Sequence, residues 1–250
     1  MKKIVFICLS ALIIFASCNT TKVEKSEKNV QTTGRKLQLN QIVQEKSWVE
    51  KSIKDFEPFI ETNIKYPYFE KIPLLNNYIE NSILNYYDSF YTMAKKDWEE
   101  MNHQRKDLNS SSSDLPPFDY IINFEVFEND KYISVLIDSY NFCGGAHGNT
   151  NLTSYTYSKE NKDLEDIHQI TNLSYIEISD ICREQLCQTL INQDDVNYSE
   201  IKSMIFDGTE PFPSNFKTFT IDKKTVTIYF EPYAVAPYSY GIQKVIFKIK

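Results

Sequence analysis

The chain has 250 residues, of which 27 are lysine or arginine and 34 are aspartate or glutamate, giving a formal charge of −7. Residues 1–40 hold seven basic residues and two glutamates, so residues 41–250 carry a formal charge of −12. A body this acidic argues against nucleic-acid binding, which depends on neutralising phosphate groups. Two interpretations stay open: the charge steers a cationic partner toward the protein, or it keeps a secreted domain soluble.

The N-terminus has the pattern of a secretory signal peptide. Lys2 and Lys3 precede an apolar stretch, residues 4–15, that is too short to span a bilayer as a permanent helix. Small residues then lead to Cys18, as in a bacterial lipobox, where the cysteine is acylated and becomes the mature N-terminus. We therefore predict a lipoprotein with a signal peptide over residues 1–17 and lipidation at Cys18. The alternative is an ordinary cleaved signal in which Cys18 has no role.

The segment after Cys18 has little to bury. Residues 18–45 are polar and of mixed charge, so we predict a disordered tether. Signal and tether together predict a folded part outside the cytoplasm, anchored through lipid to a membrane of the bacterial cell envelope. The folded body is expected as two modules, residues 46–150 and residues 151–250.

The first module is expected to combine strands with one long helix. Residues 56–66 form an extended pattern, and apolar side chains at helical spacing predict a helix over residues 74–102, with Pro73 in its first turn. The pattern changes to strict alternation over residues 118–126 and 133–137, on either side of a turn. This alternation predicts an antiparallel hairpin with one buried face.

The second module repeats the combination of helices and strands. We predict a strand over residues 152–157, a helix over 172–192 with Thr171 as a possible N-cap, and a shorter helix near 197–206. Three strands are expected to follow, around residues 219–221, 226–230 and 245–249. The whole is an α+β chain built as two helix-on-antiparallel-sheet modules packed together.

Three cysteines remain after the signal peptide and Cys18 are set aside: Cys143, Cys182 and Cys187. Because the number is odd, at least one thiol stays unpaired within a monomer, and the sequence leaves the pairing open. Cys182 shares a helix face with apolar residues and fits a core position. A zinc site built from these thiols and His147 is not expected, since the spacing is not diagnostic and the helical pair is badly placed for one metal. No metal or cofactor is predicted.

A glycine-dense turn is the most distinctive local feature. Three of the six glycines lie between Tyr140 and Asn149, in a polar run that joins two predicted strands. Glycine reaches positive φ without steric cost and allows close approach of other groups. His147 is expected to lock this turn through hydrogen bonds to the backbone, with ligand contact as the open alternative. No nucleophile or orienting carboxylate can be assigned to it, so no catalytic residue is predicted. The candidate ligand-binding residues here are Tyr140, Gly144, Gly145, His147 and Asn149.

A second motif, residues 230–241, places Tyr233 and Tyr238 between two prolines. One interpretation is an aromatic cap on the last strands. The other is a tyrosine surface for a protein or a glycan, because tyrosine combines stacking area with a hydroxyl group. Tyr233 and Tyr238 are therefore added to the candidate ligand-binding residues.

The two motifs in this order resemble a family of bacterial envelope proteins. Its members include the extracellular region of the lysozyme-sensing anti-sigma factor RsiV and the non-catalytic N-terminal region of the peptidoglycan deacetylase PdaC. In that family a strand ends in the turn found here at Gly144–Gly148. A later strand leads into the pattern found here at Pro232–Tyr238, followed by Gly241. The resemblance covers roughly residues 50–250, with a PdaC-like first module and an RsiV-like second module. Cys143 and Ala234 depart from the family pattern.

The resemblance implies a binding module without chemistry of its own. Its partners would be an envelope protein, such as a cationic lysozyme-like hydrolase, or peptidoglycan. The metal-binding Asp and His motifs of a polysaccharide deacetylase have no counterpart among these residues. Two alternatives remain: an envelope hydrolase or deacetylase acting on peptidoglycan through a site around His147, and a scaffolding lipoprotein.

Overall fold

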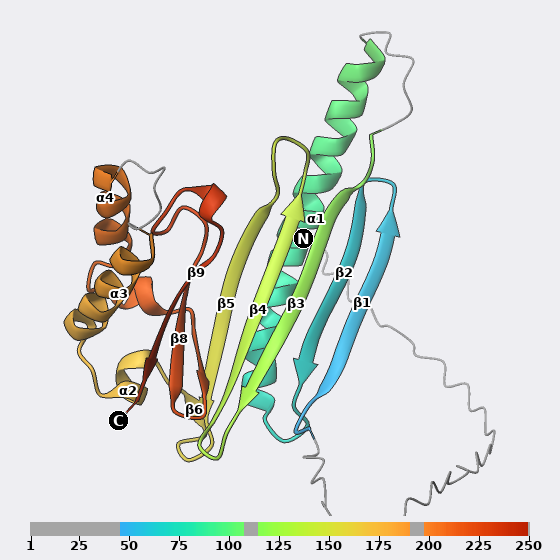
Figure 1. Ribbon diagram of the computed structural model, residues 1–250. Helices are drawn as coiled ribbons and strands as arrows, with labels where there is room; N and C mark the ends of the chain where they lie inside the picture. Colours follow the sequence, from blue (N-terminus) through green and yellow to red (C-terminus); the bar gives the residue numbers. More distant parts are fainter. Residues whose placement is uncertain (1–45, 108–114, 191–197, 250) are drawn as a thin grey trace, which may run out of the picture. The chain divides into compact units, whose positions relative to one another are not determined.

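Two sheets, each packed against helices, make up the described part of the chain (Figure 1). The computed structural model describes residues 46–107, 115–190 and 198–249, so the predicted signal peptide, Cys18 and the tether of residues 18–45 lie outside the described residues. The predicted α+β class is confirmed. The elements are β1 (Val49–Glu57), β2 (Ile60–Tyr68), α1 (Pro73–Asp107), β3 (Phe118–Glu128), β4 (Tyr132–Phe142), β5 (Asn149–Ser158), β6 (Asp163–Leu164), α2 (Ile167–Thr171), α3 (Tyr175–Leu190), α4 (Tyr198–Gly208), η1 (Pro213–Phe216), β7 (Phe219–Asp222), β8 (Thr225–Phe230), η2 (Tyr238–Tyr240) and β9 (Gln243–Lys248).

The first sheet has six strands in the order β1-β2-β3-β4-β5-β6. All neighbours are antiparallel except β2 and β3, which are parallel because the long helix α1 carries the chain back across the sheet between them. The side chains that alternate along β3 and β4 pack with the apolar stripe of α1 in one core. That core includes Leu75, Ile79, Ile83, Phe90, Tyr120, Ile122, Ile133, Val135 and Ile137. The predicted helix and antiparallel hairpin are therefore confirmed. The expectation of a single buried face is wrong for β4, because Ser134 and Leu136 on its other face are buried as well.

A buried amide fixes where α1 begins. The Asn76 side chain accepts a hydrogen bond from the Phe69 N–H and donates one to the Phe69 carbonyl, each at 2.8 Å. Asn76 thus pairs with the backbone just after β2 as a neighbouring strand would. Of the helices in the described ranges, none is long and apolar enough to cross a membrane.

The second sheet has three antiparallel strands in the order β7-β8-β9 and packs against α3 and α4 in a separate core. Cys182 is fully buried in this core with Ile178 and Leu186, as its helical position predicts, and burial raises the pKa of the Cys182 thiol to about 12. Cys143, Cys182 and Cys187 are all free thiols. The N-cap prediction at Thr171 is wrong. The chain turns left-handed at Asn172 (φ 59°), and Ser174 caps α3 by accepting from the Glu177 N–H.

The edge strand β7 rests on the face of the first sheet opposite α1. Its Ile221 N–H donates to Ser134 Oγ on β4 (3.0 Å), and its Phe219 N–H donates to Ser154 Oγ on β5 (2.8 Å). Leu136 and Leu152 meet Tyr229 of β8 in a third, small apolar cluster. An exposed strand edge presents unpaired backbone groups. Here two serine hydroxyls from another sheet satisfy them.

The expected boundary at residues 150/151 falls inside β5. Both β5 and β6 pair within the first sheet, which therefore continues to Leu164. The reason is packing, because Tyr157 of β5 is buried in the core beneath α1. Sequence patterning also missed β1, whose side chains are mostly charged and exposed on the sheet edge.

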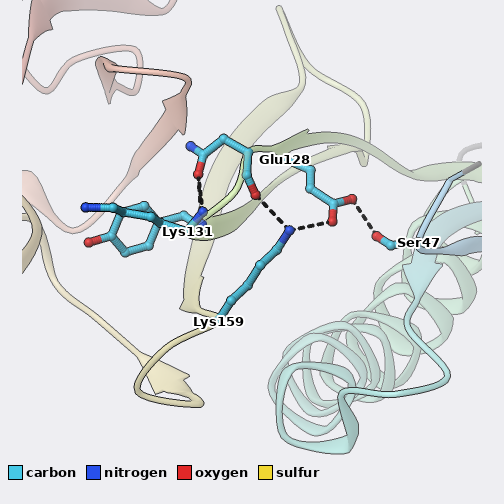
Figure 2. Close-up of polar contacts among 6 residues, drawn as sticks. Ser47, Glu128, Lys131 and Lys159 are labelled. Carbon is cyan, nitrogen blue, oxygen red and sulfur yellow. Dashed lines mark hydrogen bonds and ion pairs between the residues drawn. The ribbon is translucent and has the colours of Figure 1, made fainter. Parts of the chain in front are cut away.

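Polar contacts anchor the β3–β4 turn (Figure 2). Lys159 Nζ donates to Glu128 Oε1 at 2.8 Å and to the Asn129 carbonyl at 2.7 Å, while Ser47 Oγ donates to Glu128 Oε2 at 2.6 Å. Burial alone would raise the pKa of Glu128. The hydrogen bonds from Lys159 and Ser47 outweigh burial and hold the pKa of Glu128 below its ordinary value. These contacts join the segment before β1 to the turn and to the end of β5.

Candidate ligand-binding site

The glycine-dense turn connects β4 to β5 at the end of the first sheet. Gly144 and Gly145 have φ of +88° and +97°, in the left-handed region where L side chains are strained. Both are exposed, and a Cβ added to either would meet nothing within 4 Å. The backbone angle, not a lack of space, therefore explains why glycine occupies these two positions.

His147 joins this turn to the loop that follows β8. Its ring stacks on Tyr238, with 3.7 Å between ring centroids and 16° between planes. His147 Nδ1 lies 3.0 Å from the Gly148 carbonyl oxygen, and the Tyr238 hydroxyl donates to the same oxygen at 3.1 Å. The contact between His147 Nδ1 and the Gly148 carbonyl is of the kind expected if His147 holds the turn through hydrogen bonds to the backbone. The partner ring on the second loop could not be assigned from the sequence.

Gly148 leaves room for the Tyr140 ring. A Cβ added to Gly148 would overlap the distal ring atoms and the hydroxyl of Tyr140. Gly148 itself is buried although its neighbours in the turn are exposed. The glycine thus allows the tyrosine of β4 to pack against the turn that β4 enters.

The loop between β8 and η2 displays Tyr233. Its φ is +71°, an uncommon angle for an aromatic residue, and its side chain is 60% exposed. Two backbone hydrogen bonds hold this conformation, from the Tyr233 N–H to the Ala236 carbonyl and from the Ala234 N–H to the Glu231 carbonyl, both 3.0 Å. Further along the loop, the side chains of Val235 and Ala236 are buried. The loop is therefore anchored while the Tyr233 ring, 5.7 Å from that of Tyr238, stays accessible.

A pocket of about 320 Å³ lies between this loop and the start of β5. Its lining is polar except for the proline and the tyrosine rings: Asn141, Asn149, Thr150, Asn151, Glu231, Pro232, Tyr233 and Tyr238. Within the described part of the chain, the side-chain amides of the three asparagines have no hydrogen-bond partner. Its volume lies within the range of small-molecule sites, and the free amides can take up a ligand's hydroxyl or amide groups.

Two family models match the chain, and every lining residue of this pocket except Asn151 falls within one of them. Residues 53–150 match the family described as deacetylase PdaC, and residues 169–250 match the family described as a protein of unknown function, DUF3298. The chain is therefore similar to PdaC over the first of these ranges and to DUF3298 proteins over the second. The peptidoglycan-N-acetylmuramic acid deacetylase PdaC of Bacillus subtilis (strain 168) is 25% identical over 125 residues. The match covers 46% of this chain and only 24% of that relative. Likeness to RsiV stays a prediction.

Two solved structures share the fold. A DUF3298 family member from Bacteroides fragilis NCTC 9343 has a TM-score of 0.57 at 17% identity. A DUF3298 family protein from Pseudomonas aeruginosa PAO1 has a TM-score of 0.50 at 18% identity. Each comparison covers 81% of this chain and 90% of the other. At such low identity these similarities concern the fold alone.

The structure gathers five of the seven candidate residues around one loop pair. Asn149 of the PdaC-like module and Tyr233 and Tyr238 of the DUF3298 module line the pocket, while Tyr140 and His147 pack behind it. Gly144 and Gly145 shape the turn and do not line the pocket. Sequence reasoning missed four polar lining residues, Asn141, Thr150, Asn151 and Glu231. The alternating asparagines of β5 were a usable signal, but register alone shows that Asn141 lies opposite Asn149.

Glu231 is held in place at the wall of the pocket. Its Oε1 accepts a hydrogen bond from the Leu152 N–H of β5 at 2.5 Å. The Leu152 carbonyl accepts from Thr218 Oγ1 at 3.4 Å, so the outer edge of β5 is closed at this residue by side chains of the DUF3298 module. A carboxylate bonded to a backbone N–H keeps its orientation.

Proposed function

We propose that the protein is a non-catalytic binding module of the bacterial cell envelope, and that its pocket takes a cell-wall saccharide. The observation that carries this proposal is that three asparagines, a glutamate and two tyrosines line one pocket. Similarity to part of a peptidoglycan deacetylase supports a cell-wall ligand.

The lining suits the two surfaces of a sugar ring. A side-chain amide offers two donors and an acceptor, which matches hydroxyl and acetamido groups that both donate and accept. An aromatic ring offers a flat apolar surface with a polar hydroxyl at one end. Tyr233 and Tyr238 are the aromatic residues of the lining, and Asn141, Asn149 and Asn151 are its amide-bearing residues. A saccharide would use both kinds of group at once.

The surroundings of the site support binding in place of chemistry. The His147 ring stacks on Tyr238, and its Nδ1 lies within hydrogen-bond distance of the Gly148 carbonyl oxygen. Both contacts support a structural role for the ring. Burial, with a smaller contribution from Asp97, raises the pKa of the nearby Cys143 thiol and disfavours a thiolate nucleophile. In the described ranges, no three His, Cys, Asp or Glu side chains gather as metal ligands would.

We place this module outside the cytoplasm, attached to a membrane through a lipid on Cys18. The sequence supports this through the basic and apolar start of the chain and the small residues before Cys18. Radiolabelled palmitate should enter the wild-type protein in cells and should not enter the Cys18→Ala variant.

A cationic envelope protein, such as a lysozyme-like hydrolase, is a second candidate ligand. The formal charge of −12 over residues 41–250 favours it, because opposite charge accelerates encounter and makes binding sensitive to salt. Calorimetric titration with a C-type lysozyme at low and at physiological salt distinguishes this candidate from a saccharide.

We expect Tyr233→Ala to weaken saccharide binding about fivefold, since an aromatic contact contributes on the order of 1 kcal/mol and 1.4 kcal/mol is a factor of ten. The measurement is a calorimetric titration of the full chain in detergent with chitotetraose. The matched control is Phe56→Ala, which removes a 68%-exposed aromatic ring from β1, far from the pocket in the sequence and on another strand. Equal affinities for wild type and Tyr233→Ala would remove the pocket from the proposal.

A further inference from the structure

The pocket carries one formal charge. Among its described lining residues, Glu231 is the only aspartate, glutamate, lysine or arginine, and the remaining lining residues are asparagines, a threonine, a proline and tyrosines. No cation in the lining neutralises the carboxylate. A ligand group that meets Glu231 therefore enters a negative environment.

One oxygen of the Glu231 carboxylate accepts a hydrogen bond from the fold, and the other does not. Glu231 Oε1 accepts from the Leu152 N–H, whereas Oε2 has no hydrogen-bond partner within the described residues. The bond to the backbone of β5 fixes the position of the side chain, so Oε2 does not need to be ordered when a ligand arrives. A fixed acceptor with a full negative charge favours a cationic donor over a neutral one.

We propose that the pocket selects saccharides with free amino groups, that is, glucosamine-type units, over their N-acetylated equivalents. This inference rests on the proposed saccharide-binding function and names its ligand class. The ammonium group would donate to Glu231 Oε2, hydroxyl groups would pair with the asparagine amides, and the apolar ring face would lie on Tyr233. A sugar bearing a carboxylate is disfavoured, because it would face Glu231 without a cation to compensate.

The size of the preference follows from the exposure of the site. The pocket is open to solvent at Tyr233 and Asn149, so water screens the ion pair and limits its effect. We expect glucosamine tetramers to bind about three- to tenfold more tightly than chitotetraose at low salt and at a pH where the amine is protonated. The preference should shrink as salt is added, since exposed charges are screened.

The test compares these two tetramers on the full chain, in wild type and in Glu231→Gln. Glutamine keeps an oxygen that can accept from the Leu152 N–H but removes the charge, so the variant should fold, and its affinities for the two tetramers are compared with each other. Its preference for the amino sugar should fall to about one. Glu61→Gln, which removes an exposed carboxylate of β2, is the matched control and should keep the preference.

Three results separate this inference from the function on which it rests. Equal or tighter wild-type binding of chitotetraose overturns the amino-sugar preference and leaves saccharide binding intact. A preference that survives in Glu231→Gln, or that does not respond to salt, removes the role of Glu231. Failure of both tetramers to bind the wild-type protein overturns the proposed function itself. If Glu231→Gln melts at a much lower temperature than wild type, the salt dependence of the wild-type preference decides the matter.

Discussion

Gly208→Ala should destabilise the protein by about 3 kcal/mol or more, although alanine is the better helix former. Gly208 ends α4 with an ordinary helical φ, so the substitution alone would favour the helix by up to ~1 kcal/mol. An added Cβ, however, would overlap the backbone carbonyl oxygen of Ala234 and lie 2.8 Å from Val235 Cγ1. Val235 and Ala236 are buried, so moving the loop away from the added Cβ would disrupt the packing of these two side chains. The free-energy cost of this steric overlap exceeds the stabilisation that the higher helix propensity of alanine provides.

Urea unfolding followed by circular dichroism measures this effect. Ser203→Ala, at an exposed position of the same helix, is the matched control and should change the unfolding free energy by less than about 0.5 kcal/mol. Because the displaced loop carries Tyr233, Gly208→Ala should also lose saccharide affinity. A variant as stable as Ser203→Ala would show that α4 and this loop do not pack as described.

Ser134→Ala should cost about 1–3 kcal/mol, because it removes a buried hydrogen-bond acceptor and leaves a backbone donor unsatisfied. Ser134 is fully buried, and its Oγ accepts from the Ile221 N–H at 3.0 Å. The same hydroxyl lies 2.9 Å from Thr156 Oγ1, so a second buried group loses its partner. The contact joins the two sheets, and the loss should appear in global unfolding.

Ser52→Ala is the control for this change, since Ser52 is an exposed serine on the edge strand β1. Ser134→Thr retains the hydroxyl and should be less destabilising than Ser134→Ala. A free energy of unfolding for Ser134→Ala equal to that of Ser52→Ala would contradict the account of how β7 is held.

Local patterning was sufficient to predict the elements that bury one face. The stripe of Leu75, Ile79 and Ile83 predicts α1, and the alternation of Ile133, Val135 and Ile137 predicts the α1-facing side of β4, because each pattern follows the period of its element. Cys182 was placed in the core by the same argument. These features depend on residues close together in the chain.

Contacts between distant segments could not be predicted in this way. The other face of β4, with Ser134 and Leu136, looks solvent-exposed in the pattern, yet the second sheet covers it. The pocket is hidden for the same reason, since Glu231 reaches Asn149 and Asn151 only after the two sheets have packed. Both motifs were recognised as candidate sites. Only the three-dimensional structure shows that the two motifs lie together, with the ring of His147 stacked on that of Tyr238.

Side-chain amide resonances measured by two-dimensional NMR give the most direct test of the central claim, that the pocket beside Tyr233 binds saccharide. Titration of the ¹⁵N-labelled protein with glucosamine tetramer should shift the amide pairs of Asn141, Asn149 and Asn151. Those of Asn76 and Asn102 should stay unchanged, since both are buried residues of α1, outside the pocket lining. Shifts confined to other residues, or none at millimolar ligand, would contradict the account.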